Sequence, residues 1–287
     1  MFASLAGVLF DGFAYGMLLF LLSVGLSVTL GMMNFVNLAH CSFAMVGGYA
    51  TVSLMNSFGW PFFATLPMAF LAAALVSIVL ERTLYRRLYR ASDLDQCLFT
   101  IGVVFISIAA YAWFYGTVVQ STEMPGYLRG RVDIFGMSLA AYRLFLIAMG
   151  LVVAALLIFL LETTRFGAQV RAAVDNQRMA RGLGIDVDRA FMITFALGGG
   201  LAGLGGALAI EIVGLDHAFA LNYLVYVLIV VAVGGLGSIG GSFAAALVLG
   251  ISDMAGKYYF PWLGAFLIYL VMVALLMWRP VGLFGKR

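Results

Sequence analysis

The stretch Glu162–Arg189, ETTRFGAQVRAAVDNQRMARGLGIDVDR, interrupts an otherwise apolar chain. It holds nine of the 29 charged residues in a sequence of 287, and long apolar runs flank it on both sides. The whole chain is 64% hydrophobic and only 10% charged, whereas soluble domains carry roughly 25% charged residues. Because such a chain cannot present a hydrated surface all round, the sequence predicts a polytopic membrane protein with a charged insert outside the lipid.

Seven apolar runs are long enough for a membrane helix, which needs about 20 residues. They cover residues 5–30, 35–56, 61–81, 97–119, 143–161, 190–213 and 262–279. An eighth apolar stretch, 220–255, is interrupted by glycines between Gly234 and Gly241, and its two halves each look too short to cross, which indicates a broken or re-entrant pair. Continuous apolar runs favour helices over alternating strands. We therefore expect an all-α bundle of about eight membrane segments, forming a single domain over residues 1–287.

The distribution of basic residues predicts the orientation, because cytoplasmic loops are enriched in lysine and arginine. Twelve of the sixteen basic residues lie in the 82–96 loop, in the 162–190 insert or in the tail from Arg279 onward. The other four, which would face the opposite side, are Arg129, Arg131, Arg143 and Lys257. The N-terminus is then outside, and the C-terminus and the 162–189 insert are in the cytoplasm.

The insert has the pattern of a helix from Gly167 to Gly184, where a glycine would end it. Three residues spaced for ion pairing on one face are Arg171, Asp175 and Arg178. A second face carries the small residues Ala173, Ala180 and Gly184. A helix with these two faces could sit in a groove of a soluble partner, or it could be a solvated loop helix without one. The pattern leaves both readings open.

Several motifs in and after the insert resemble the permease family of branched-chain amino acid ABC importers, closest to the shorter of its two permease types. They are Thr164-Arg165-Phe166-Gly167, Arg171-Ala172-Ala173, Ala180, Gly184-Ile185, Phe195-Ala196-Leu197-Gly198 and Leu201-Ala202-Gly203-Leu204-Gly205-Gly206. The resemblance implies that the insert docks on an ATPase subunit through Arg171, Ala173, Asp175, Arg178, Ala180, Gly184 and Ile185. It also implies a bacterial inner-membrane location, a second homologous permease, two cytoplasmic ATPases and a periplasmic solute-binding protein.

Two polar interruptions are candidates for the substrate path. The first, Gly31–His40, also matches the family, with Cys41 in place of the usual glycine. Its polar residues, which are costly in hydrocarbon unless they face protein or water, are Asn34, Asn37, His40 and Ser42. The second contributes Gly234, Gly235, Gly237 and Ser238. Repeated interruptions often mark a transport path, but hydrogen bonds between helices and close helix packing explain the same residues, so both interpretations stay open.

No Walker A motif occurs, since Gly256-Lys257 and Gly285-Lys286 lack the upstream glycine and the following hydroxyl. No catalytic or metal-ligand constellation is visible. Acids near the spans are few (Asp11, Glu211 and Asp253) and are expected at helix ends or in packing, with Asp216 and His217 in an outer loop.

We therefore expect a subunit that is not an enzyme and has no cofactor of its own, driven by partner ATPases that bind ATP and Mg. No nucleic-acid partner is expected, and the membrane lipid is the surrounding solvent. The resemblance points to branched-chain amino acids or related small polar solutes as substrates. The alternative is a secondary transporter or channel, for solutes such as urea or aromatic acids, that works without an ATPase. An integral membrane enzyme is the least favoured class.

Overall fold

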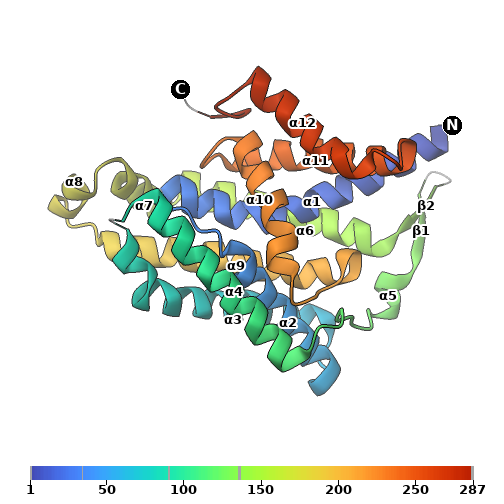
Figure 1. Cartoon of the computed structure of the whole chain (residues 1–287), viewed down its shortest axis with the longest axis horizontal. Coiled ribbons are helices and arrows are strands. Elements are labelled where there is room, and N and C mark those ends of the chain that lie inside the picture. Colours follow the sequence, from blue (N-terminus) through green and yellow to red (C-terminus); the bar gives the residue numbers. More distant parts are fainter. Residues whose placement is uncertain (1, 34, 90, 135–136, 286–287) are drawn as a thin grey trace.

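The computed structural model describes residues 2–33, 35–89, 91–134 and 137–285, and it is almost entirely helical (Figure 1). The α-helices in chain order are α1 (Phe2–Met33), α2 (His40–Phe58), α3 (Phe62–Thr83), α4 (Asp93–Tyr115), α5 (Gly126–Arg129), α6 (Ala141–Ile158), α7 (Arg165–Asp175), α8 (Gln177–Gly182), α9 (Val187–Val213), α10 (Phe219–Gly234), α11 (Ile239–Tyr259) and α12 (Gly264–Trp278). A 3-10 turn, η1 (Tyr85–Leu88), follows α3, and a π-helical turn, η2 (Phe159–Thr163), extends α6. The strands β1 (Arg131–Ile134) and β2 (Met137–Ala140) form an antiparallel hairpin, which the all-helical expectation did not include.

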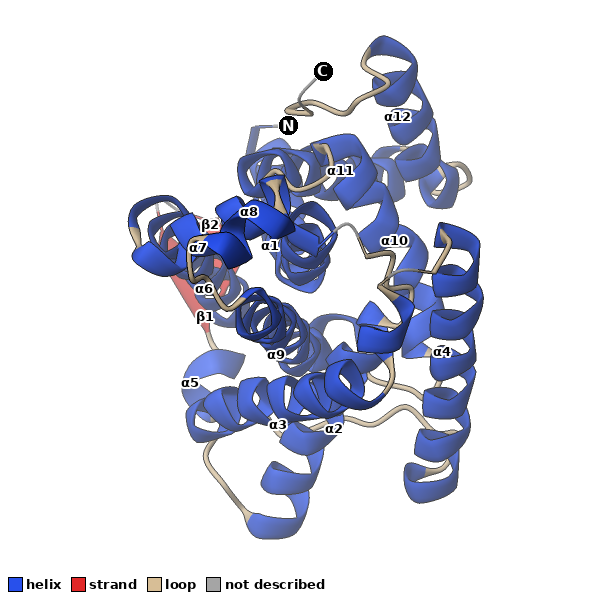
Figure 2. Cartoon of the chain, turned by 90° about the vertical axis from the view of Figure 1, so that its left-hand side faces the viewer, coloured by secondary structure: helices blue, strands red, loops and turns tan. Residues whose placement is uncertain are grey.

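The molecule has two ends that matter for function. Helices α7 and α8 lie at one end, here called the insert end, and the β1–β2 hairpin lies at the other, here called the distal end (Figure 1). Figure 2 looks onto the insert end and shows α1 and α9 inside the bundle, with α4 at one edge. Helix α9 runs from the insert to the distal end, and its 27 residues correspond to about 40 Å at 1.5 Å per residue.

The centre of the bundle is built by α1 and α9, which are largely buried, whereas little of α4 is buried. Small residues allow this packing. A Cβ atom placed on Gly47 of α2 would lie 2.1 Å from the carbonyl oxygen of Gly203 in α9, so the two backbones touch directly. Close approach of this kind is the usual use of glycine between membrane helices.

Six helices of the described residues are long and apolar enough to cross a membrane. They are Leu5–Gly31, Phe62–Thr83, Asp93–Tyr115, Ala141–Thr163, Val187–Val213 and Ile239–Tyr259, and two shorter apolar helices are Phe219–Gly234 and Phe266–Trp278. The chain is thus a multi-pass helical membrane protein. The total of eight segments and the outward N-terminus stay predictions. The expectation that both halves of 220–255 are too short is wrong for the second half, because α11 has 21 residues.

The glycine-rich interruption is a turn between α10 and α11 at the insert end, not a break in the middle of a helix. A Cβ on Gly31, near the end of α1, would lie 2.0 Å from the Cα of Gly237. The C-terminal tail covers the same turn, because the Leu283 and Phe284 N–H groups donate to the carbonyls of Val233 (2.7 Å) and Gly234 (3.1 Å). The turn, the insert and the tail therefore meet at one end of the bundle.

Candidate functional site

The connector between α1 and α2 is held in place by polar side chains of α4. The N–H of Val36 donates to Oε1 of Gln96 (3.0 Å), and the N–H of Leu38 donates to Oγ1 of Thr100 (3.2 Å). Buried backbone donors need such partners, because an unpaired one costs free energy comparable to a lost hydrogen bond. Sequence reasoning missed Gln96 and Thr100, since nothing local indicates that they reach back some 60 residues to this connector.

Of the four polar residues predicted for the first interruption, Asn34 lies outside the described residues, and the other three are buried. Asn37 Oδ1 accepts from the Ala39 N–H (3.1 Å) just before α2 begins. His40 Nε2 lies 3.1 Å from the Leu22 carbonyl of α1, so this nitrogen carries the proton and donates it. Asn37 and His40 therefore fix the start of α2 against the bundle, as the hydrogen-bonding interpretation expects. The hydroxyl of Ser42 has no hydrogen-bond partner among the described residues, and a role in the path stays a prediction for all of these positions.

The second interruption lies directly against the first. Ser238 Oγ accepts from the Gly241 N–H (3.0 Å) and so caps α11, and the Ser242 and Ser27 hydroxyls lie 2.9 Å apart between α11 and α1. An insert-end cavity of about 1020 Å³ lies between the turn and the insert. Its polar lining comes from Glu162, Arg171 and Asp175 on one side and from the 237–240 segment on the other. The structure thus brings the predicted path residues Gly237 and Ser238 next to the predicted docking segment.

The insert is two helices, and the single helix predicted from Gly167 to Gly184 is wrong. Asn176 separates α7 from α8 in an extended conformation (φ −156°, ψ 98°), and its Oδ1 accepts from the Met179 N–H (3.0 Å). Asparagine is among the preferred N-terminal caps of helices, which explains why α8 restarts there. Gly184, with φ +83°, lies just past the end of α8, where the pattern placed a helix end.

The faces of the insert differ from the expectation. Ala173 and Ala180 are buried in a small apolar cluster with Val187 and Phe191 of α9. In this structure the chain's own α9 covers both alanines, so neither of them is exposed on the surface of the insert. Docking through the insert stays a prediction. No ion pair joins the predicted set Arg171, Asp175 and Arg178, all of which lie in the described insert, and Arg171 donates instead to the Leu161 carbonyl.

Three large apolar side chains of the insert are exposed, namely Val174 of α7 and, more strongly, Met179 and Leu183. Met179 is 65% exposed and Leu183 is 79% exposed, although both lie within the charged insert. Gly184 and Ile185 follow directly, and Ile185 packs against the buried cluster. A short helix that is anchored by its small residues and presents large apolar side chains outward has the features of a contact surface.

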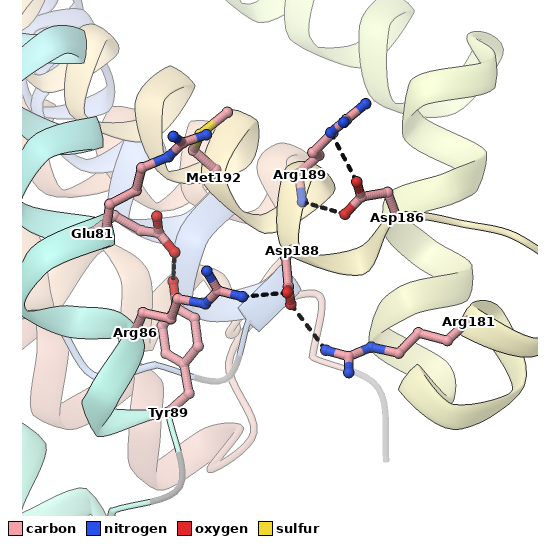
Figure 3. Close-up of polar contacts among 9 residues, drawn as sticks. Glu81, Arg86, Tyr89, Arg181, Asp186, Asp188, Arg189 and Met192 are labelled. Carbon is pink, nitrogen blue, oxygen red and sulfur yellow. Dashed lines mark hydrogen bonds and ion pairs between the residues drawn. The ribbon is translucent and has the colours of Figure 1, made fainter.

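A cluster of ion pairs joins the insert to the α3–α4 connector (Figure 3). Asp188 of α9 accepts from Arg86 and from Arg181 (2.9 Å), and Asp186 pairs with Arg189 (2.8 Å). Beside it lies an open depression of about 440 Å³. Since Asp188 binds an arginine from each of two other segments, the cluster ties α8, α9 and the connector together.

Tyr89 lies between this cluster and the core. Its hydroxyl donates to Glu81 Oε1 (2.7 Å), and burial, followed by this hydrogen bond, raises the pKa of Tyr89 far above its ordinary value. The neutral ring packs edge to face on Phe191 (6.1 Å between centroids) and on Phe35 (5.6 Å). Phe35 belongs to the α1–α2 connector, so the series Phe191–Tyr89–Phe35, called the aromatic link below, connects the insert to the first interruption.

The distal end holds two ion pairs between residues of the long helices. Lys257 pairs with the buried Asp253 (2.6 Å), and Arg143 pairs with Asp11. Asp11 and Asp253 thus pair with basic residues at this end, and no group of three metal-ligating side chains occurs within the described ranges. An open distal cavity of about 390 Å³ lies where α9 ends and α10 begins.

Comparison with known proteins gives one consistent result. The chain matches the family described as "Branched-chain amino acid transport system / permease component" over residues 8–276. It is 29% identical, over 94% of its length and 90% of the relative's, to the probable branched-chain amino acid transport permease protein LivH of Methanocaldococcus jannaschii. In Escherichia coli K12 it is 24% identical to the high-affinity branched-chain amino acid transport system permease protein LivH (97% of this chain, 94% of the relative) and 26% identical to LivM of the same description (93% and 68%). No solved structure matches the chain with statistical significance.

Proposed function

Because the chain belongs to the family of branched-chain amino acid transport permease components, we propose that it is the membrane-spanning permease subunit of an ABC importer. It would move branched-chain amino acids or related small polar solutes inward across the bacterial inner membrane. The proposed assembly contains a second homologous permease, two cytoplasmic ATPases that bind ATP and Mg, and a periplasmic solute-binding protein. The similarity to both LivH and LivM of Escherichia coli supports a pair of related permeases.

The observation that carries this proposal is the structure of the insert within a permease of this family. Buried Ala173 and Ala180 fix α7 and α8 against α9, while Met179 and Leu183 remain exposed. An exposed apolar pair on α8 and at its C-terminal end suits burial in a pocket of an ATPase subunit, since interface energy concentrates in a few large apolar anchors. In the proposed orientation this surface faces the cytoplasm, where the ATPases are. We therefore assign the proposed docking contact to Met179 and Leu183 in place of Ala173 and Ala180.

The aromatic link suggests how a docked ATPase could act on the path. Movement of α8 would displace Phe191 of α9, which shares an apolar cluster with Ala180. Tyr89 and Phe35 would then carry the displacement to the α1–α2 connector. The insert-end cavity between the insert and the 237–240 turn would change shape in the same movement. Coupling through such a series of contacts requires that these residues adopt two distinct arrangements. A transport assay is therefore needed to test it.

The test substitutes Leu183→Asp and compares it with Leu94→Asp. Leu94 is a matched control, because it is also strongly exposed (67%) and lies in the first turn of α4, between Asp93 and Asp95. Loss of an interface anchor costs more than about 1–2 kcal/mol. We therefore expect Leu183→Asp to weaken co-purification of the ATPase at least roughly tenfold and to abolish ATP-driven uptake of leucine into proteoliposomes.

Leu94→Asp should retain both properties, and both variants should insert and melt like the wild type. Normal ATPase binding and uptake by Leu183→Asp would overturn the docking surface. Uptake that continues without ATP would favour the secondary transporter or channel instead.

A further inference from the structure

The distal cavity is lined mainly by aromatic and polar side chains. It is formed where α9 ends, by the turn that follows, and by one face each of α10 and α12. Besides three small or aliphatic residues, its lining consists of Asp216, Phe219, Asn222, Tyr223, Tyr226 and Tyr269. The cavity lies at the end opposite the insert, about 40 Å away along α9. In the proposed orientation this is the side from which solute arrives.

The aromatic rings form a continuous series along the cavity. Phe219 stacks on Tyr223 with centroids 4.4 Å apart, Tyr226 lies 5.8 Å from Tyr223, and Tyr269 lies 6.3 Å from Tyr226. The three tyrosines are half-buried and line the cavity together. By contrast, Trp262 at the same end is exposed, as expected for a residue in a headgroup belt. The rings of the series thus line a cavity, whereas Trp262 does not.

The charge of the cavity is negative. Asp216 is its single ionisable acid, no lysine or arginine lines it, and Asp216 has no ion pair among the described residues. Lys257, near Tyr15 at the same end, is engaged by Asp253. A half-buried carboxylate without a cationic partner, beside ring faces that carry negative charge density, attracts a cation, since aromatic faces bind ammonium groups within about 6 Å of the centroid.

We propose that the distal cavity binds a primary ammonium compound that carries a short apolar chain. The carboxylate of Asp216 pairs with the ammonium group, the faces of Tyr223 and Tyr226 contact the apolar chain, and the Asn222 amide can donate to a second polar group of the ligand. Naming the transported amino acid as the ligand rests on the proposed function. The ammonium specificity rests on the cavity alone.

The first experiment measures binding without transport. The purified full-length permease, in nanodiscs with the subunits that accompany it, is titrated with 3-methylbutylammonium and with the neutral 3-methylbutanol, using tyrosine fluorescence and calorimetry. We expect the ammonium compound to bind at least tenfold more tightly than the alcohol, and Asp216→Asn to abolish this preference. Asp133→Asn, which changes an exposed acid of β1 at the same end, is the matched control and should leave the preference intact.

The ring contribution is tested separately. Tyr226→Phe keeps the ring and should bind the ammonium compound within about twofold of the wild type, whereas Tyr226→Ala should weaken binding several-fold. Equal affinity for the amine and the alcohol in the wild type, or an unchanged preference in Asp216→Asn, would show that the proposal is wrong.

Uptake of leucine by the complete importer separates the two proposals. A raised KM in Asp216→Asn, with the ATPase still bound, supports the cavity as the entry site. Amine binding that depends on Asp216, in an importer that takes up no leucine, would refute the proposed substrate and leave the ammonium site standing. Normal uptake kinetics together with lost amine binding would refute the cavity as the entry site.

Discussion

Replacing Gly31 by alanine tests the contact that joins the two interruptions. The added Cβ would lie 2.0 Å from the Cα of Gly237 and 2.9 Å from its nitrogen. Carbon atoms rest about 3.5–4.0 Å apart, so the last turn of α1 and the α10–α11 turn must separate by about 1.5–2 Å. Both contacts are with backbone, which cannot rotate away as a flexible side chain would.

The expected cost follows from the size of that displacement. Overpacking of a close contact costs about 1–3 kcal/mol. A change of 1 kcal/mol shifts the melting temperature by about 2–4 °C for domains of 150–250 residues. Gly31→Ala should therefore lower the apparent Tm of the purified protein by roughly 2–12 °C.

Gly240→Ala is the matched control from the same turn. A Cβ on Gly240 meets no atom within 4 Å, and the residue lies in the first turn of α11. Alanine is the better helix former by about 0.8–1.0 kcal/mol, so this variant should melt at or slightly above the wild-type temperature. The assay is thermal unfolding in detergent, followed by the fraction of monodisperse protein. Equal melting temperatures for Gly31→Ala and Gly240→Ala would refute the direct contact between the two turns.

Two further substitutions test the connector and the ion-pair cluster. Gln96→Leu leaves the Val36 N–H without its acceptor. We expect the free energy of unfolding to fall by about 1–3 kcal/mol and hydrogen exchange in the α1–α2 connector to become faster. Unchanged exchange in the connector would contradict the contact. Asp188→Asn weakens the shared acceptor of Arg86 and Arg181, whose side chains are more than half exposed. We expect the free energy of unfolding to fall by less than about 1 kcal/mol, and this difference should disappear at high salt. A loss of stability that does not depend on salt would argue against an ionic role.

The predictable part of the fold is the part that apolar length determines. Long hydrophobic runs can be satisfied in lipid only by structures that pair their own backbone groups, so the helical membrane fold follows from the sequence. The interruption after Gly234 was also visible, because glycines are unfavourable inside helices. Its length was overestimated, since Gly240 and Gly241 continue into α11 once Ser238 caps that helix.

The missed features depend on contacts between distant segments. Gln96 and Thr100 are ordinary helix residues until the α1–α2 connector lies beside them. The break at Asn176 was missed because asparagine is tolerated within a helix and preferred as a cap, and only tertiary context decides between the two. Asp188 shares its carboxylate with Arg86, about a hundred residues away, so no local spacing rule could have identified the pair.

The alanine face shows most clearly where pattern reasoning stops. Periodicity establishes that Ala173 and Ala180 share one side of the insert, but it does not say which surface covers that side. The structure shows α9 covering it through Phe191, and this changes what a substitution there would mean. Arginine at Ala180 would place a charge in a buried apolar cluster and displace the insert, so lost transport would not distinguish a broken insert from a broken interface. A change at exposed Leu183 leaves the buried cluster intact, and it can therefore separate the two.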